Sequence, residues 1–384
     1  METMRPFFPF AFTVTLIGGA LGSDPGVPLR SRSRVPDSSP VRPAIPIGQP
    51  FVLKPPLGLP PVPVPKDNPL TRETVLLGRK LFFDKSLSRD GTVSCASCHD
   101  PRHAFADPKP VSDGVNGKKG NRNAPALLNI AYSGILFWDG RAPTLEAQAG
   151  GPVQNPVEMA HSLVGVERKL AADPVYADLF AKAWGPGSIT WEMAAKSIAS
   201  YERTLVSGNS RFDRYYYGGD KTAMTPSAIR GLKLYLNPSL KAANCVSCHR
   251  IDVKSSTFTE DRFHNTGAGW DPVKKTLLDL GRSLIQPGPK MAGAFRSMTL
   301  RNIARSAPYM HDGAIKTLEE SIDFYFDGGR PNTNISVDMP DPGLPDIPKA
   351  EQAQAKKDLV EFMKMLDGDL PPDAVPPDWK PPQP

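Results

Sequence analysis

The chain of 384 residues contains only four cysteines and six histidines, and no apolar run after the first 22 positions is long enough to cross a membrane. A membrane helix needs about 18 uncharged residues in succession. Alternation of apolar and polar residues is also scarce, and because alternation marks half-buried strands, we expect a mainly α fold. The net charge of +6 comes with no nucleic-acid motif, so it indicates solvated surface or an acidic partner and no nucleic acid.

Proline is abundant, with 43 residues, and much of the excess lies at the two ends of the chain. Residues 1–22 combine an early arginine, a short apolar run and small residues before a possible cleavage point, which is typical of a secretory signal. A retained N-terminal anchor is the alternative. Residues 23–68 and 371–384 lack hydrophobic periodicity, so we expect an extended linker and a tail. The mature protein should then be periplasmic or secreted, without a stable membrane span.

The folded part, about residues 69–370, shows helical spacing of apolar residues. Residues 191–205 carry one apolar stripe, Thr225 precedes a helix with proline in its first turn, and Thr317 and Glu320 form a capping box. Apolar positions between 359 and 366 predict a last amphipathic helix. The length suits two or three domains.

An internal repeat divides the folded part. "GRKLFFDKSL" (78–87) and "GLKLYLNPSL" (231–240) agree at Gly, Lys, Leu, Ser and Leu, and each is followed by a pair of cysteines. This pattern indicates duplication of one module. We predict domains over 69–215 and 216–370, with long loops.

Each cysteine pair has the spacing C-x-x-C and is followed directly by histidine, in "SCASCHD" (94–100) and "NCVSCHR" (244–250). Two disulfides are unfavourable, because cysteines three apart in one helical turn are poor partners. A four-cysteine zinc site is the stronger rival. The histidine after each pair favours the haem c attachment motif instead. Cys95, Cys98, Cys245 and Cys248 would form thioethers, and His99 and His249 would ligate the two irons.

Several segments resemble the bacterial di-haem cytochrome c peroxidase and MauG superfamily. They are "LGRKLFFDKSLS", "NRNAPALLNIAYSGILFWDGRAPTLEAQAGGPVQNPVEM", "FHNTGAG" and "TLRNIARSAPYMHDGAIKTLEESI", and they occur in the family's order. The resemblance covers about residues 69–368. It implies two cytochrome c-like haem domains, the N-terminal one binding peroxide and the C-terminal one transferring electrons.

The resemblance also implies roles for residues around the first haem. Glu158 matches the family's distal glutamate, which would move a proton during O–O cleavage. Gln148 and Pro152 match other distal positions, and Trp138 matches a tryptophan near both haems that would relay electrons. A surface position for Glu158 and core packing for Trp138 are the alternatives.

A calcium ion between the domains is a further implication of the resemblance. Asn123 matches a side-chain ligand, and the positions of Ser306 and Pro308 match backbone carbonyl ligands. Oxygen donors of this kind suit a hard cation.

At the second haem, the alignment with the family places Tyr325 at the sixth-ligand position, as in MauG-like proteins. A phenolate oxygen would favour ferric iron and lower the potential. Met310 is the substitute ligand, and simple core packing of Tyr325 is the other alternative.

Two departures from the family pattern matter. The loop "PVSDGVNGKKGNRN" after the first motif has no histidine, and His103 is expected at the surface. The first haem should therefore be open without prior reduction. In addition, Ala243 stands where MauG-like proteins have a tryptophan, which puts long-range oxidation of a protein partner in doubt.

We therefore expect a di-haem peroxidase that reduces hydrogen peroxide with electrons from a small donor protein, such as a cytochrome c or a cupredoxin. Oxidation of side chains in a protein partner is the second enzymatic interpretation. A non-enzymatic di-haem electron carrier is the third. His264 and His311 match recurrent family histidines, and no chemical role is assigned to them.

Overall fold

The computed structural model describes residues 45–187, 189–237, 245–339 and 347–380. Helices dominate these ranges, as expected, and the described residues all belong to one compact unit. The α-helices are α1 (Arg72–Phe83), α2 (Cys95–Cys98), α3 (Leu145–Gln154), α4 (Leu163–Ala171), α5 (Pro174–Trp184), α6 (Trp191–Glu202), α7 (Arg211–Tyr216), α8 (Pro226–Tyr235), α9 (Cys245–Cys248), α10 (Leu318–Phe326) and α11 (Lys349–Lys364). No helix within these ranges has the length and apolar character to cross a bilayer. The predicted signal at 1–22 lies outside the described residues.

Short 3₁₀ turns and strands connect the helices. The turns are η1 (Lys85–Leu87), η2 (Pro101–His103), η3 (Val115–Gly117), η4 (Ile130–Tyr132), η6 (Arg282–Leu284) and η7 (Ile303–Arg305). The strands form two antiparallel pairs, β1 (Phe263–His264) with β4 (Phe295–Arg296), and β2 (Trp270–Asp271) with β3 (Thr276–Leu277). Most of the described chain between the helices is irregular. The backbone N–H and C=O groups of such segments are not committed to helices or sheets, so they can bond to side chains, cofactors or ions.

The predicted helix starts are confirmed. Thr317 caps α10 by accepting a hydrogen bond from the backbone N–H of Glu320 at 3.1 Å, and the carboxylate of Glu320 accepts one from the N–H of Thr317. Thr225 caps α8, with Pro226 as its first residue. Both caps satisfy N–H groups that a helix start leaves unpaired. The last helix, α11, buries the predicted positions Leu359, Phe362 and Met363, whereas the predicted Leu366 is buried just beyond the end of the helix at Lys364.

The apolar positions predicted for α6 from Ala194 onward are buried, and beyond that prediction the helix is buried on every side from Ala194 to Glu202. Lys196, Ser197, Ser200 and Glu202 are buried together with its apolar residues. The reason is its place in the fold, since α6 packs against α1, α3 and α4. Two of its polar groups are satisfied inside the helix, where Ser197 and Ser200 donate to carbonyls one turn earlier.

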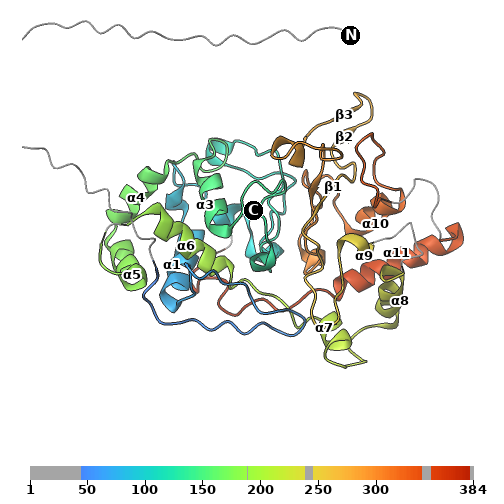
Figure 1. Cartoon of the computed structure of the whole chain (residues 1–384), viewed down its shortest axis with the longest axis horizontal. Coiled ribbons are helices and arrows are strands. Elements are labelled where there is room, and N and C mark those ends of the chain that lie inside the picture. Colours follow the sequence, from blue (N-terminus) through green and yellow to red (C-terminus); the bar gives the residue numbers. More distant parts are fainter. Residues whose placement is uncertain (1–44, 188, 238–244, 340–346, 381–384) are drawn as a thin grey trace, which may run out of the picture. The chain divides into compact units, whose positions relative to one another are not determined.

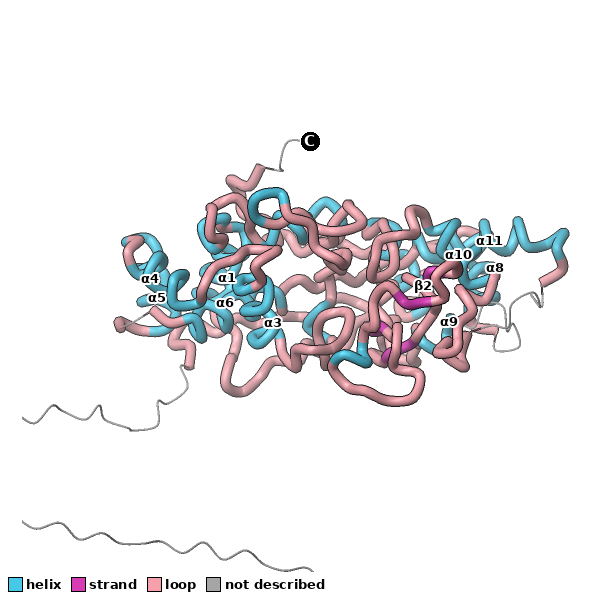
Figure 2. Tube along the Cα trace, turned by 90° about the horizontal axis from the view of Figure 1, so that it is seen from above, coloured by secondary structure: helices cyan, strands magenta, loops and turns pink. Residues whose placement is uncertain are grey.

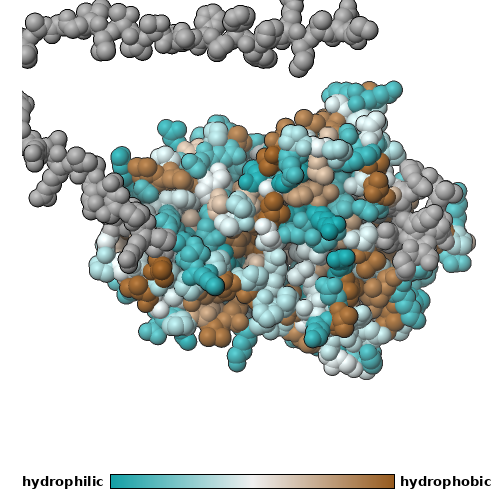
Figure 3. Space-filling model, viewed as in Figure 1, coloured by the Kyte–Doolittle hydropathy of each residue, from teal (hydrophilic) through white to brown (hydrophobic). Residues whose placement is uncertain are grey.

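The buried apolar residues form two large clusters. One cluster combines residues between 77 and 205, and the other combines residues between 212 and 366. In Figure 1 and Figure 2 the helices α1 and α3–α6 lie together, and α8–α11 lie together beside the strands. On the face shown in Figure 3, apolar side chains form small groups separated by polar ones.

Each cluster contains one close helix crossing at a glycine of the sequence repeat. A Cβ on Gly78 in α1 would lie 1.8 Å from the backbone oxygen of Ser197 in α6, and one on Gly231 in α8 would lie 2.0 Å from that of Asp358 in α11. Only glycine permits such an approach of two helix backbones. The corresponding positions of the repeat therefore make corresponding contacts.

In the residues that the structure describes, the predicted linker and tail do not stand apart from the folded part. Residues 45–68 are extended but hydrogen-bonded along their length: Ile47 donates to Ala183 of α5, and Gly58 accepts from Ser256. The tail packs back on the first cluster, where Ala374 is buried and accepts a hydrogen bond from Tyr201 at 2.5 Å. A proline-rich segment has little pattern of its own, but its carbonyls still bond to a folded neighbour.

Candidate functional site

The first cysteine motif forms the short helix α2, which Ser94 and Ser97 stabilise with a capping box. The backbone N–H of His99 donates to Cys95 at 2.9 Å, so the histidine ends this turn. Its Nδ1 lies 3.0 Å from two backbone oxygens, those of Phe105 and Pro125. A carbonyl partner at Nδ1 leaves Nε2 as the nitrogen available for a metal, which is the usual arrangement of a ligating histidine.

The second motif repeats this geometry on α9. The N–H of His249 donates to Cys245 at 2.8 Å, and its Nδ1 lies 3.0 Å from the oxygen of Phe258. Tyr235 of α8 donates its hydroxyl to the backbone oxygen of His249. Burial lowers the pKa of both histidines, since the charged imidazolium is disfavoured there. Neutral imidazole is the form that binds iron.

The cysteines themselves exclude the two rival interpretations. All four are free thiols, so no disulfide forms. Within the described ranges, the one group of three or more His, Cys, Asp or Glu side chains close enough to share an ion is Cys248, Glu260 and His264, so the two pairs do not converge on a zinc. The geometry of both motifs therefore fits haem c.

Three aromatic rings stand behind each motif in matching positions. Phe82, Phe105 and Tyr201 pack together in the first half, and Tyr235, Phe258 and Phe362 pack together in the second. In each set one ring belongs to the residue whose carbonyl faces the histidine, Phe105 in the first and Phe258 in the second. The two sites share one supporting frame.

A large cavity opens at the second motif. It holds about 1930 Å³ of empty space, the opening to solvent included, and Cys245, Cys248 and His249 line it. Tyr325 and Met310 line the same cavity, so both candidate ligands reach the site. Burial chiefly, and then the Cys248 and Cys245 thiols, raises the pKa of Tyr325. Deprotonating its hydroxyl would need a positive partner such as iron.

The distal residues of the first site come from α3 and the loop after it. Gln148 and Pro152 are four residues apart on α3 and share one face of that helix. Glu158 follows in the loop and accepts a hydrogen bond from the Asn155 side chain at 2.6 Å. Burial raises the pKa of Glu158, whereas Asn155 and the positive charge of Arg141 oppose the rise. The backbone oxygen of Glu158 accepts a hydrogen bond from Val115 at 2.8 Å, and the oxygen of Asp113, two residues before Val115, lies 3.9 Å from the Cys98 thiol, so Glu158 lies near the first motif.

A second repeat, longer than the first, was missed by the sequence reasoning. Residues 129–146 and 302–319 agree at Asn, Ile, Ala, Ser, Asp, Gly, Thr, Leu and Glu when each position is matched to the one 173 residues later. Both copies begin with an asparagine at positive φ, 67° for Asn129 and 59° for Asn302, and both end at a threonine helix cap. The signal "NIAYS" against "NIARS" was present in the sequence.

This register matches the surroundings of the two sites. Pro152 in α3 corresponds to Tyr325 in α10, and Phe137 corresponds to Met310. Phe137 and Met310 also share a positive φ, 65° and 70°. At both positions where the second site offers a ligand side chain, the first site has an apolar residue that cannot ligate iron.

The residues between the two sites are joined by hydrogen bonds. Trp138 donates its indole N–H to the backbone oxygen of Asn123 at 2.8 Å, and Asn123 donates its own N–H to His311 at 2.7 Å. The Asn123 amide nitrogen donates to the carbonyls of Asp107 and Lys109, which uses both of its N–H donors and leaves its side-chain oxygen to act as an acceptor or ligand. Asn123 lines the cavity with Ser306 and Pro308. The candidate ligands are the side-chain oxygen of Asn123 and the backbone oxygens of Ser306 and Pro308, and oxygen ligands of this kind fit a hard cation.

His103 and His264 lie in different surroundings. The side chain of His103 is 38% exposed and lies 3.6 Å from Asp100, which agrees with a surface position. His264 lines the cavity between Glu260 and Asp338. Ala243 lies outside the described residues.

Comparisons with known proteins agree with this geometry. A family model described as di-haem cytochrome c peroxidase matches residues 72–222. The methylamine utilization protein MauG of Methylorubrum extorquens is 38% identical over 308 residues, which cover 79% of this chain and 81% of that protein. The cytochrome-c peroxidase IdrP1 of a Pseudomonas species (strain SCT) is 36% identical over 336 residues, 81% of this chain and 86% of that protein. A crystal structure of a MauG-like protein associated with microbial copper homeostasis superposes with a TM-score of 0.75 at 33% identity, over 86% of this chain and all of that one.

Proposed function

Because the chain belongs to the di-haem cytochrome c peroxidase and MauG family, we propose that it reduces hydrogen peroxide to water with electrons from an external donor. The observation that carries this proposal is the asymmetry of the two sites. The first has a carboxylate, Glu158, and apolar residues at both repeat positions where the second has Tyr325 and Met310. One site is thus suited to substrate and the other to electron transfer.

His99 and His249 would hold the two irons, and the cysteines of α2 and α9 would hold the two macrocycles. A c-type haem supplies an iron that exchanges electrons with peroxide and with the donor. The chain orients both histidines through carbonyl partners at Nδ1, which fixes the tautomer and strengthens Nε2 as a donor.

Glu158 is the proton-transfer residue of the proposal. Its carboxylate takes a proton from one oxygen of peroxide and returns it to the other, which then departs as water. The reaction consumes two electrons and two protons for each peroxide and yields two waters. The Asn155 bond holds the carboxylate in place, and Gln148 adds a polar group on the facing helix α3.

Tyr325 is the proposed sixth ligand of the second haem, with Met310 as the alternative. Both side chains line the cavity of that site, and only Tyr325 lies on the helix that corresponds to α3. Burial raises the pKa of the Tyr325 phenol in the metal-free protein, so the phenol keeps its proton until a bound metal ion displaces it.

Trp138 is proposed to relay electrons between the sites, and Asn123 with the carbonyls of Ser306 and Pro308 to bind calcium. The hydrogen bonds that join Trp138, Asn123 and His311 support a rigid bridge there. A cation on the Asn123 side-chain oxygen would stiffen the same bridge. Loss of the cation is then expected to affect the electron relay through Trp138, and loss of Trp138 to affect cation binding.

The history and location of the protein belong to the same proposal. The matching glycines, aromatic frames and 129–146/302–319 segments support two haem domains that arose by duplication, over residues 69–215 and 216–370. The N-terminal signal supports export to the periplasm. A small acidic donor protein would suit the net charge of +6.

A second candidate function, oxidation of side chains in a protein partner, is favoured by the 38% identity to a MauG protein. The two are separated by steady-state assay of the holoenzyme with peroxide and a reduced small cytochrome. The proposal expects two cytochromes oxidised for each peroxide consumed. Binding of both haems without peroxide consumption would instead leave a di-haem electron carrier.

A further inference from the structure

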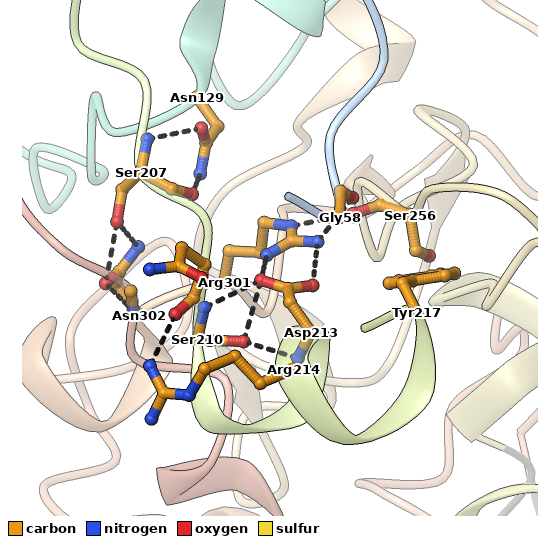
Figure 4. A network of polar contacts seen from close by, with 12 residues as sticks. Gly58, Asn129, Ser207, Ser210, Asp213, Arg214, Tyr217, Ser256, Arg301 and Asn302 are labelled. Carbon is orange, nitrogen blue, oxygen red and sulfur yellow. Dashed lines mark hydrogen bonds and ion pairs between the residues drawn. The ribbon is translucent and has the colours of Figure 1, made fainter. Parts of the chain in front are cut away.

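A fully buried ion pair joins α7 to the segment after the second site. Arg301 donates to both carboxylate oxygens of Asp213 at 2.9 Å, and both side chains have no exposed surface. The same guanidinium donates to the backbone oxygens of Ser256 and Gly58, each at 2.7 Å. Figure 4 shows the group and its neighbours. A buried pair is retained only when its remaining hydrogen bonds are made, as they are here.

This pair is connected to His249 of the second site through Phe258. The Arg301 guanidinium lies 5.5 Å from the ring centre of Phe258, whose carbonyl faces His249. Thr299 and Leu300 donate to the carbonyls of Thr257 and Phe258, at 2.7 and 3.3 Å. Three consecutive residues, 299–301, thus hold three consecutive carbonyls, 256–258. The last of these carbonyls sets the orientation of the imidazole.

The first site has no arginine at the position that matches Arg301, and therefore no matching ion pair. His99 faces two carbonyls, and the position that corresponds to Arg301 in the 173-residue register is Leu128, a buried apolar residue. The ion pair therefore distinguishes the second site from the first, and it is not part of the repeated frame.

The proline-rich segment before α1 completes the arrangement. Gly58 has φ +87°, and a Cβ on it would lie 1.9 Å from the Asp213 carboxylate. Its carbonyl accepts hydrogen bonds from both Ser256 and Arg301. Gly58 lies 190 positions before Cys248 in the sequence. It nevertheless contacts the residues that hold the carbonyl facing His249.

We propose that Asp213, Arg301 and Gly58 are positioning residues for His249, and that they tune the second haem without affecting the first. The carbonyl of Phe258 strengthens the imidazole as an electron donor to iron, which stabilises the ferric state. Loosening residues 256–258 weakens that hydrogen bond. The midpoint potential of the second haem then rises.

The test uses the full-length holoprotein and the Gly58→Ala variant, with Gly219→Ala as its matched control. Gly219 has a similar φ of +78°, but a Cβ there meets no atom within 4 Å, so the control carries the backbone strain without the contact to Asp213. Spectroelectrochemistry and low-temperature EPR report both haems. Gly58→Ala is expected to move the second haem to a more positive potential and to change its EPR signal. The first haem and the control should stay as in the wild type.

If Gly58→Ala does not incorporate both haems, the Arg301→Lys and Arg301→Met variants test the proposal by the same measurements of potential and EPR. Lysine keeps the charge but cannot make the paired bonds to Asp213 and the two carbonyls. Its shift should be smaller than that of the methionine variant. Wild-type potentials and EPR for the second haem in both variants would overturn the proposal, and so would equal changes at the two haems.

Discussion

Replacing Glu158 by glutamine tests the proton transfer at constant side-chain shape. Glutamine keeps the length and can still accept the 2.6 Å hydrogen bond from Asn155, so folding and haem content should not change. It cannot take up the proton that peroxide must lose. General acid–base catalysis contributes about 10²–10⁴-fold in rate, which corresponds to about 3–5 kcal/mol of activation free energy. We therefore expect kcat to fall by two to four orders of magnitude.

The assay is steady-state peroxide reduction with a reduced small cytochrome, with kcat and KM measured separately. Glu351→Gln is the control, because that carboxylate is exposed at the start of α11. Burial raises the pKa of Glu158, and its ionised form is the base, so wild-type kcat should be lost as the pH falls through that raised pKa. The variant should lack this acid limb. Wild-type kcat in Glu158→Gln would refute the assignment.

Three further predictions concern the second haem, the distal carboxylate and the buried ion pair. Tyr325→Phe should change the EPR signal of the second haem and Met310→Leu should not; the reverse result would assign Met310 as ligand. Asn155→Ala removes a bond that stabilises the Glu158 carboxylate, so the acid limb of kcat should move to higher pH, and an unchanged pH profile contradicts this. Asp213→Asn leaves a buried arginine without its charge partner and should lower the free energy of unfolding by about 3–5 kcal/mol. Guanidinium denaturation followed by circular dichroism measures that loss, and an unaltered midpoint is the contrary outcome.

The haem attachment motifs were predictable because their chemistry is local. Cysteines three apart on one turn, followed by histidine, present their groups to one cofactor whatever the rest of the chain does. Helix caps such as Thr225 and Thr317 were predictable for the same reason, since each is a contact over three residues. The structure adds the carbonyl partners of His99 and His249, which lie 6 and 9 residues later at Phe105 and Phe258.

The contacts of the proline-rich segments were not predicted, because composition describes only what a segment can bury by itself. Residues 45–68 have no amphipathic pattern, yet the carbonyl of Gly58 satisfies a buried arginine 243 positions away. Similarly, Ala374 in the tail accepts a hydrogen bond from Tyr201 across 173 positions. Neither contact has a signal in the local sequence, because the partner supplies the geometry.

The sequence by itself predicted which residues would attach the two haems, where several helices begin, and which family the chain resembles. These properties depend on short spacings that hold in any fold. The family resemblance already predicted unlike surroundings for the two motifs, and only the tertiary structure showed the cavity that Tyr325 and Met310 share at the second motif and the buried ion pair beside Phe258, whose carbonyl faces His249. Those differences come from residues tens to hundreds of positions apart, which meet only when the whole core has formed.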